Sequence, residues 1–220
     1  MAIGPFKMSS LKSKILQLAQ TSVYQIKVAP PSAVLTHLNA NGFDYSTEGE
    51  NIELLCSSAS LPGTSLSTHE VVGDFTGVRE RMVYRRQYDD TVDLTFYVDH
   101  DYKVFNFFEG WINYIAGQGN GQRLSNSDAR KRDGNYRMNY PVTYKTNMYI
   151  VKFEKDVSNS PDIFYHDKTH QLTYTLVNAF PLNIVSTPVS YESSSILKFT
   201  VSMAFMRYTV DNTQIRVPNP

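Results

Sequence analysis

The segment YHDKTH combines two histidines and an aspartate, residue types that can bind a metal. His166 and His170 flank Asp167 in the sequence YHDKTH, and two histidines four residues apart on a helix can hold a zinc ion. The segment follows Pro161 and leads into a predicted strand, where this spacing gives the two rings no shared face. A metal site also needs three or four converging ligands. We therefore predict no metal and no cofactor.

The single cysteine is the one thiol that could act as a nucleophile. Cys56 has no adjacent histidine or basic residue, so the sequence favours a buried structural thiol. A single cysteine excludes an intramolecular disulfide and fits a reducing compartment. The chain contains no GxSxG, Walker, HExxH or paired CxxC motif. We predict a protein with no catalytic residues.

Two further patterns superficially resemble phosphate or nucleic-acid sites. The GQGNG run from Gly117 to Gly121 follows a predicted helix, whereas a phosphate loop precedes one, so a helix C-cap and a turn are favoured. The basic residues of 123–137 have no aromatic residue among them before Tyr136, which favours a solvated or inter-subunit loop over a nucleic-acid site. A formal net charge of +0 also argues against a free nucleic-acid-binding protein.

The most regular charge pattern lies in a predicted long hairpin, Ser67–Gln87, with its turn at Asp74–Gly77. Acids dominate its first strand and bases its second, in the order Glu70, Asp74, Arg79, Glu80, Arg81 and Arg85. Period-two alternation places the three arginines on one face of the second strand. We expect the charges to pair across the hairpin or between subunits. Exposed pairs contribute only about 0–1 kcal/mol each, so they would fix register and the choice of neighbour.

A strand and a helix follow this hairpin directly in the sequence. Apolar residues alternate with polar ones from Val92 to Val98, which predicts a strand with one buried face. The apolar spacing then changes to three and four residues, which predicts a helix over about Tyr102–Ala116. We expect Asp99 or Asp101 to cap its first turn and Gly117 to end it. Its predicted core residues are Val104, Phe108, Trp111 and Ile115.

Composition indicates one β-rich domain. The chain has 220 residues, 13% aromatic and 19% charged, a balance that favours strands and large contact surfaces. Zero net charge removes the repulsion that keeps soluble monomers apart. No segment is apolar enough to span a bilayer, 1–20 does not read as a signal peptide, and we predict no direct membrane binding.

The predicted fold is mainly β, a sandwich or barrel with one packed helix and a short N-terminal helix over 10–20. We assign 1–21 to an N-terminal extension, 22–212 to the β domain and 213–220 to a C-terminal tail. Within the domain we expect inserted loops at about 30–51, 121–139 and 156–170, and a strand over 142–155.

Several segments of the chain together resemble a known family. The YDD of 88–90, the aromatic helix and the IAGQGN of 115–120 resemble the tail tube proteins of contractile-tailed bacteriophages. The flanking strands VYQIKV (23–28), IELLCSSASLPG (52–63), YTLVNAFPLNIV (174–185) and ILKFTVSMAFMRYTV (196–210) occur in the matching order. The resemblance covers roughly 22–30 and 52–210, and it implies a tail-tube β fold.

The resemblance implies a structural virion protein. Members form stacked hexameric rings that make the inner tube of the tail, through which DNA leaves the capsid. The implied partners are further copies of the chain, the tail sheath, the baseplate and the tail terminator, with transient, non-specific contact to DNA in the lumen. The implied location is the virion tail, assembled in the host cytoplasm. Alternatives are a tube-initiating baseplate protein, the tube of a related contractile injection system, or, outside the family, a β-sandwich carbohydrate-binding or hydrolase domain.

A tube through which DNA passes needs a lining that does not hold phosphate. Each lysine or arginine contact to phosphate adds affinity through counterion release, so we expect a polar to acidic lining. Glu70, Asp74 and Glu80 are the candidates to face the lumen, with Arg79, Arg81 and Arg85 turned into the wall or paired with acids. A slip of one residue in strand register would invert this assignment.

Overall fold

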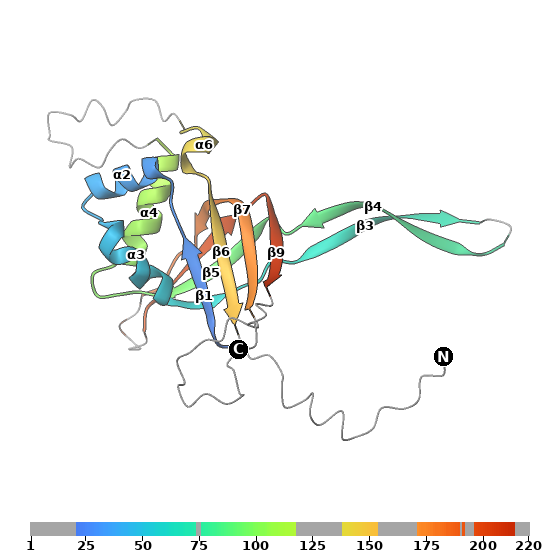
Figure 1. Cartoon of the computed structure of the whole chain (residues 1–220), viewed down its shortest axis with the longest axis horizontal. Helices are drawn as coiled ribbons and strands as arrows, with labels where there is room; N and C mark the ends of the chain where they lie inside the picture. Colours follow the sequence, from blue (N-terminus) through green and yellow to red (C-terminus); the bar gives the residue numbers. More distant parts are fainter. Residues whose placement is uncertain are drawn as a thin grey trace, which may run out of the picture.

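A curved antiparallel sheet with helices at one end and a long hairpin at the other forms the described part of the chain (Figure 1). The structure is a computed structural model, and it describes residues 21–73, 76–117, 138–153, 171–189, 191 and 196–213. The elements are β1 (Tyr24–Val28), α2 (Ser32–Ala40), α3 (Tyr45–Leu54), β2 (Cys56–Ala59), β3 (Thr64–Val72), β4 (Arg79–Tyr88), β5 (Thr91–Tyr97), α4 (Lys103–Ile115), α6 (Pro141–Tyr144), β6 (Thr146–Phe153), β7 (Gln171–Ile184), β8 (Lys198–Ala204) and β9 (Arg207–Thr213).

The long strand β7 joins the two halves of the main sheet. Its first half pairs with β6 and β9, and its second half pairs with β8. The sheet order is β1-β6-β7-β8-β5-β2, with β9 also on β7. Buried residues from both halves belong to one hydrophobic core. The predicted mainly β fold is therefore confirmed, and the structure shows it as an antiparallel sheet with few helices.

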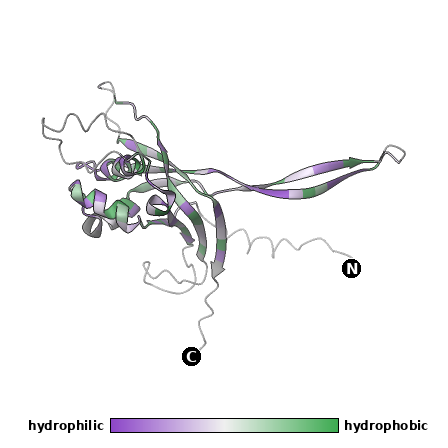
Figure 2. Ribbon diagram, turned by 90° about the horizontal axis from the view of Figure 1, so that it is seen from above, coloured by the Kyte–Doolittle hydropathy of each residue, from purple (hydrophilic) through white to green (hydrophobic). Residues whose placement is uncertain are grey.

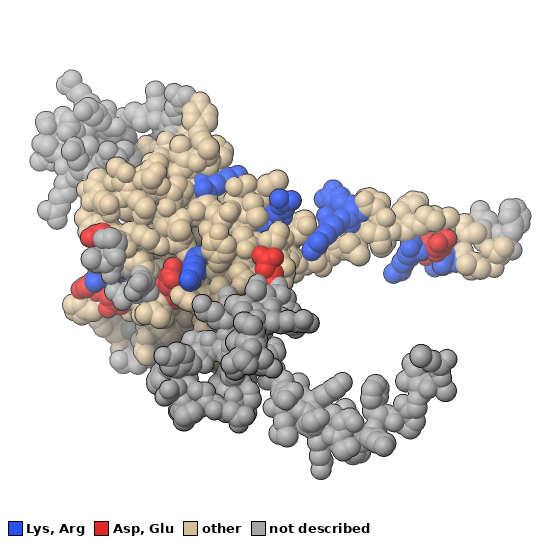
Figure 3. Space-filling model, viewed as in Figure 1, with Lys and Arg blue, Asp and Glu red and all other residues tan. Residues whose placement is uncertain are grey.

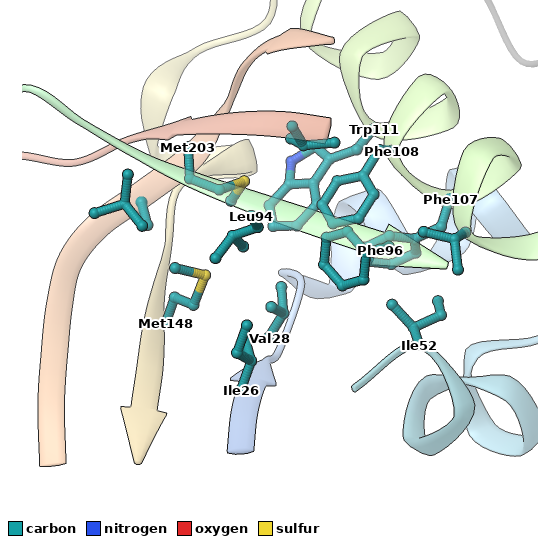
Figure 4. Packing of buried hydrophobic residues seen from close by; sticks show 14 of the residues in the cluster. Ile26, Val28, Ile52, Leu94, Phe96, Phe107, Phe108, Trp111, Met148 and Met203 are labelled. Atoms are coloured by element: carbon teal, nitrogen blue, oxygen red, sulfur yellow. The ribbon is translucent and has the colours of Figure 1, made fainter. Parts of the chain in front are cut away.

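Helix α4 contributes the largest side chains of that core (Figure 4). Val104, Phe108 and Trp111 are fully buried, and Ile115 packs against them partly buried. The Trp111 Nε1 donates a hydrogen bond of 3.2 Å to the carbonyl oxygen of Tyr144, which satisfies its polar atom inside the core. The period change that predicts the helix corresponds to the junction between β5, where Val92, Leu94 and Phe96 are buried, and α4.

The start of α4 differs from the prediction, whereas its end agrees. The N-cap is Tyr102, in the left-handed region at φ 56°, with no side-chain cap. The expected caps have other partners, since Asp99 accepts from the His100 amide at 2.7 Å and Asp101 lies 3.3 Å from the Lys103 ammonium. Gly117, at φ 68°, ends the helix with its amide donating to the Tyr114 carbonyl.

The expected loop at 30–51 is wrong, because this segment forms most of two helices. The Pro30–Pro31 pair suggests a break, but Pro31 is the N-cap of α2, where a missing amide hydrogen costs nothing. Leu38 of α2 and Ile52 of α3 are buried in the core. Tertiary packing therefore stabilises two helices whose own sequences lack a strong amphipathic pattern.

Other predictions fall partly or wholly outside the described residues. These include the N-terminal helix at 10–20, most of the 121–139 loop, the 156–170 loop and nearly all of the C-terminal tail. The strand expected over 142–155 is shorter, because Pro141 begins the short helix α6 and β6 starts at Thr146.

Candidate assembly surfaces

Strands β3 and β4, from Thr64 to Tyr88, form a two-stranded hairpin that projects from the rest of the described chain, here called the body (Figure 1). The two strands pair with each other and with no strand of the body. Nearly every residue of the hairpin is exposed. An isolated two-stranded hairpin is marginally stable in water, so this element needs support that the body does not supply along its length.

Hydrophobic residues occur along both strands of the hairpin (Figure 2), and the register places them on both of its faces. Seven of them are between 43% and 70% exposed: Leu66, Val71, Val72, Val78, Met82, Val83 and Tyr84. Single exposed apolar residues are ordinary on protein surfaces, but several on one projecting element indicate an interaction site. The hairpin is therefore a candidate assembly surface.

A β-bulge in the hairpin changes the predicted faces. Ser67 pairs with Arg85 and Thr68 pairs with Val83, so Tyr84 is an extra residue in β4. Because of it, Arg85 shares the face of Ser67 and Val71, opposite to the face of Arg81. The expectation that the three arginines lie together is therefore wrong for Arg85.

The register also separates the two described glutamates that were candidates for the lumen. Glu70 pairs with Arg81 and Val72 with Arg79, so these four residues share one face. Val71 pairs with Glu80 on the opposite face, and Glu70 and Glu80 therefore cannot line the same surface of the hairpin. Asp74 lies outside the described residues.

Exposed ion pairing within the hairpin is limited. The Arg79 Nη1 lies 3.8 Å from the Glu70 Oε1, with both side chains largely exposed. Arg81 and Arg85 form no ion pair with any residue that the structure describes. The described hairpin carries four arginines and two glutamates, and Figure 3 shows basic side chains along it while most acidic side chains of the same view lie on the body. The hairpin and the body are thus complementary in charge.

The β1 edge of the main sheet is covered within the chain. Tyr45 of α3 donates a hydrogen bond to the Val28 carbonyl, and the Val28 amide donates to the Glu53 Oε1 at 3.3 Å. Tyr24 of β1 donates to the Cys56 carbonyl of β2 at 3.0 Å, so the two halves of the sheet meet at this side. Helix α3 therefore blocks part of an edge that another chain could otherwise extend.

The β9 edge has no such cover in the described part of the chain. Strand β9 pairs with β7 on one side only. Thr209, Val210 and Asp211 are exposed along it. An uncovered strand with free backbone groups is a template for pairing with another chain. This edge is the second candidate assembly surface.

The described residues provide no chemistry that competes with an assembly role. Burial raises the pKa of the Cys56 thiol from 9.0 to about 11, while hydrogen bonds with Tyr24 and Ser58 act in the opposite direction. Burial likewise raises the pKa of Tyr24, with Cys56 adding to the effect. No group of three metal-binding side chains occurs among the residues described, and His166 and His170 lie outside them. No described helix combines the length and apolarity needed to cross a membrane.

Sequence reasoning missed the residues at the base of the hairpin. Tyr88, Asp89 and Asp90 form the YDD pattern, and the structure places them where the hairpin meets the body, beside an open, polar hollow that Ser65, Arg85 and Met206 also line. The pattern itself was the signal, although its spacing alone does not predict what these side chains contact.

Comparison with known proteins agrees with this fold. No curated protein sequence matches the chain. A chain of the sheath–tube complex of the extracellular contractile injection system PVC, in its extended state, is 13% identical, with a TM-score of 0.50 over 95% of this chain and 100% of that one. A chain of the anti-feeding prophage tube-terminating cap is 15% identical, with a TM-score of 0.51 over 89% and 92%. At these identities the likeness establishes the fold alone.

The sequence comparison goes further than the structural one. The profile of the phage tail tube protein family matches residues 19–211, which includes the hairpin, the body and the YDD pattern between them. The match spans nearly the whole chain and agrees with the resemblance of the YDD and IAGQGN segments. With its antiparallel fold and projecting hairpin, this chain belongs to the phage tail tube protein family, a family of structural, non-enzymatic proteins.

Proposed function

We propose that the chain is the repeating subunit of the inner tube of a contractile phage tail, and that it forms six-membered rings which stack into a hollow tube. The observation that carries this proposal is the hairpin, whose apolar side chains are 43–70% exposed and find no partner on the body. A second copy of the chain supplies that partner. Ring closure then also covers the β9 edge.

The face of the hairpin that carries Val71 and Met82 packs on the neighbouring copy. On this face Val71 and Met82 are 43% and 51% exposed, and the opposite charges of Glu80 and Arg85 balance. Burial of apolar area contributes about 25 cal/mol per Å². Arg85, the arginine of this face, favours the same partner, because the neighbouring body is richer in exposed acids.

The opposite face, with Glu70, Arg79 and Arg81, faces the channel. The Glu70 carboxylate lies 3.8 Å from Arg79, which offsets one of the two basic charges that Arg79 and Arg81 place on this face. The offset lowers the affinity of the lining for phosphate, because fewer uncompensated bases release counterions. This arrangement keeps Glu70 as a lumen-facing residue and assigns Glu80 to the contact between copies.

The chain then acts in the virion tail, with the sheath around the tube and the baseplate and terminator at its ends. The relative in the PVC sheath–tube complex supports a tube of this general kind. A tube that lengthens as protein concentration rises supports a repeating subunit. A single ring that does not lengthen would instead favour the tube-initiating baseplate role.

Assembly in solution tests the proposal directly. Native mass spectrometry and sedimentation should show hexamers and longer species for the wild-type chain. The double variant Val71→Ser, Met82→Ser should remain monomeric with an unchanged far-UV spectrum. Leu54→Ser, at a residue of α3 that is 78% exposed, is the matched control and should assemble normally. A double variant that assembles as well as the wild type would overturn the role of the hairpin.

The channel assignment has its own test. Tubes of the Glu70→Lys variant should retain short double-stranded DNA and release it with added salt, since each new phosphate contact raises the salt dependence by about one unit. Wild-type tubes should not retain the DNA under the same conditions. If Glu70→Lys tubes behave as the wild type, then Glu70 does not face the channel.

A further inference from the structure

The hairpin meets the body at a small set of residues, here called the root: Gly63, Thr64, Arg86, Gln87, Tyr88 and Asp89. Two short connections enter it, 60–63 from β2 and 89–90 to β5. A hairpin on two such connections could swing as a unit, because no other element holds its strands. The side chains of the root therefore determine whether the joint is loose or fixed.

Four hydrogen bonds connect the two segments of the chain that meet at the root. The Gly63 amide donates to the Asp89 Oδ2 at 2.5 Å, and the Asp89 amide donates to the Gly63 carbonyl at 3.3 Å. The Thr64 Oγ1 donates to the Gln87 carbonyl at 2.8 Å and accepts from the Arg86 Nε at 3.0 Å. A Cβ added to Gly63 would lie 2.8 Å from the same Asp89 oxygen, so a side chain at this position would displace that carboxylate.

Arg86 connects the root to the far half of the sheet. Its guanidinium lies 4.6 Å from the ring centroid of Tyr88 and 5.8 Å from that of Tyr208 on β9. The centroids of these two rings lie 5.5 Å apart in an edge-to-face arrangement. The Tyr208 ring also contacts the ring of Tyr174 on β7, with 5.7 Å between centroids. Tyr208 is buried within the core. The backbone of the root thus leads to β2 and β5, while its side chains hold β9 and β7.

We propose that the root is a rigid joint and that Arg86 is the positioning residue that sets the direction of the hairpin. Its planar side chain donates to Thr64 and stacks on Tyr88 and Tyr208 at the same time, a combination that a lysine cannot reproduce. The joint fixes the hairpin before any neighbour is met, so the subunit is preorganised for docking.

The length of the hairpin explains why a rigid joint matters. Nine paired residues at about 3.3 Å each make an arm of roughly 30 Å, and a swing of about 10° at the root moves its far end by about 5 Å, the spacing of one strand. An error of that size would bring the hairpin to the wrong strand of a neighbour. The orientation of the hairpin is a property of the single chain, and only its consequence for assembly rests on the proposed function.

Pulsed electron spin resonance on dilute, monomeric protein measures this orientation. Spin labels at Val78→Cys near the far end of the hairpin and at Asn183→Cys on β7, in a Cys56→Ser background, report the distance between arm and body. We expect a narrow distribution for the intact root. Arg86→Gln, Arg86→Lys and Tyr208→Leu should each broaden it by about 5 Å, the displacement of a small swing.

Arg85→Gln is the matched control, because Arg85 is the adjacent arginine of β4 and lies outside the root contacts. It removes the same charge and should leave the distribution narrow. Equal widths for Arg86→Gln and Arg85→Gln would overturn the proposal. Root variants that lower the melting temperature without broadening the distribution would overturn it as well, because Arg86 would then only stabilise the fold. The distance measurement does not depend on rings, so its failure is distinguishable from failure of assembly.

Discussion

Helix α4 and the β3–β4 hairpin are both rich in large apolar side chains, yet they place them in opposite environments. Phe108 and Trp111 of α4 are fully buried, whereas Val71 and Met82 of the hairpin are 43% and 51% exposed. The described body therefore has a buried apolar core, and the hairpin carries a further apolar set that no described residue covers. On the proposed function, the first set folds the subunit and the second assembles it.

Truncation of one large side chain in each region should show the largest difference between the helix and the hairpin. Trp111→Ala should lower the free energy of unfolding by about 3–5 kcal/mol, because it removes a fully buried ring and leaves a cavity. Met82→Ala should change the stability of the monomer by no more than about 0.5 kcal/mol. Urea unfolding of both variants checks the pair. Similar losses at the two positions would contradict the division into a folding and an assembling part.

The reactivity of a thiol should also differ between the body and the hairpin. Burial raises the pKa of Cys56 to about 11, so at pH 8 its thiolate is about a hundredfold rarer than for an ordinary thiol. Iodoacetamide should therefore react about a hundredfold more slowly with Cys56 than with Tyr84→Cys on the hairpin, measured in a Cys56→Ser chain.

The same shift has a consequence for stability. A pKa that is raised by folding contributes stability that is complete below the ordinary value of 9.0 and is lost as pH rises through about 11. The Cys56→Ser chain should therefore lose less stability over this range than the wild type. Equal alkylation rates for Cys56 and the hairpin thiol would show that Cys56 is not shielded.

The end of α4 offers a smaller test within the folded body. Gly117 has a φ of 68°, which L-residues adopt at a cost of about 1 kcal/mol or more. Gly117→Ala should therefore lower the free energy of unfolding by about that amount, whereas Gly117→Asn should cost less, since asparagine tolerates this region. Thermal unfolding compares the two. An unchanged melting temperature for Gly117→Ala would mean that the C-cap is not needed.

The ion pair of the hairpin should give the smallest effect. The Arg79 and Glu70 side chains are 3.8 Å apart and largely exposed, so Arg79→Gln should change the stability of the monomer by less than about 1 kcal/mol. Chemical unfolding at low and high salt measures it. A larger loss would show that the hairpin is stabilised by its own charges. The hairpin would then resemble the body in being stabilised within the single chain.

The sequence was most informative where apolar spacing alone specifies an element. The alternation around Leu94 and the helical spacing around Trp111 predicted β5 and α4, because each buries one continuous face. Helices α2 and α3 were missed because tertiary contacts of Leu38 and Ile52, and not a strong amphipathic pattern, hold them in place.

The candidate surface was predictable as a hairpin but not in its faces. The bulge at Tyr84 changes which residues share a face, and nothing in the residue types around Tyr84 indicates an unpaired position. The arginine that holds the root was also hidden, because its partner Tyr208 lies on β9, far along the chain. Contacts between residues far apart in the sequence therefore could not be predicted from the spacing of residue types.

Cryo-electron microscopy of the assembled wild-type protein would show how the copies contact one another. We expect six-fold rings in which each hairpin lies against the neighbouring copy, with Val71 and Met82 removed from water and Glu70 facing the channel. Rings in which the hairpin stands free in solvent, or a protein that remains monomeric at high concentration, would contradict this expectation.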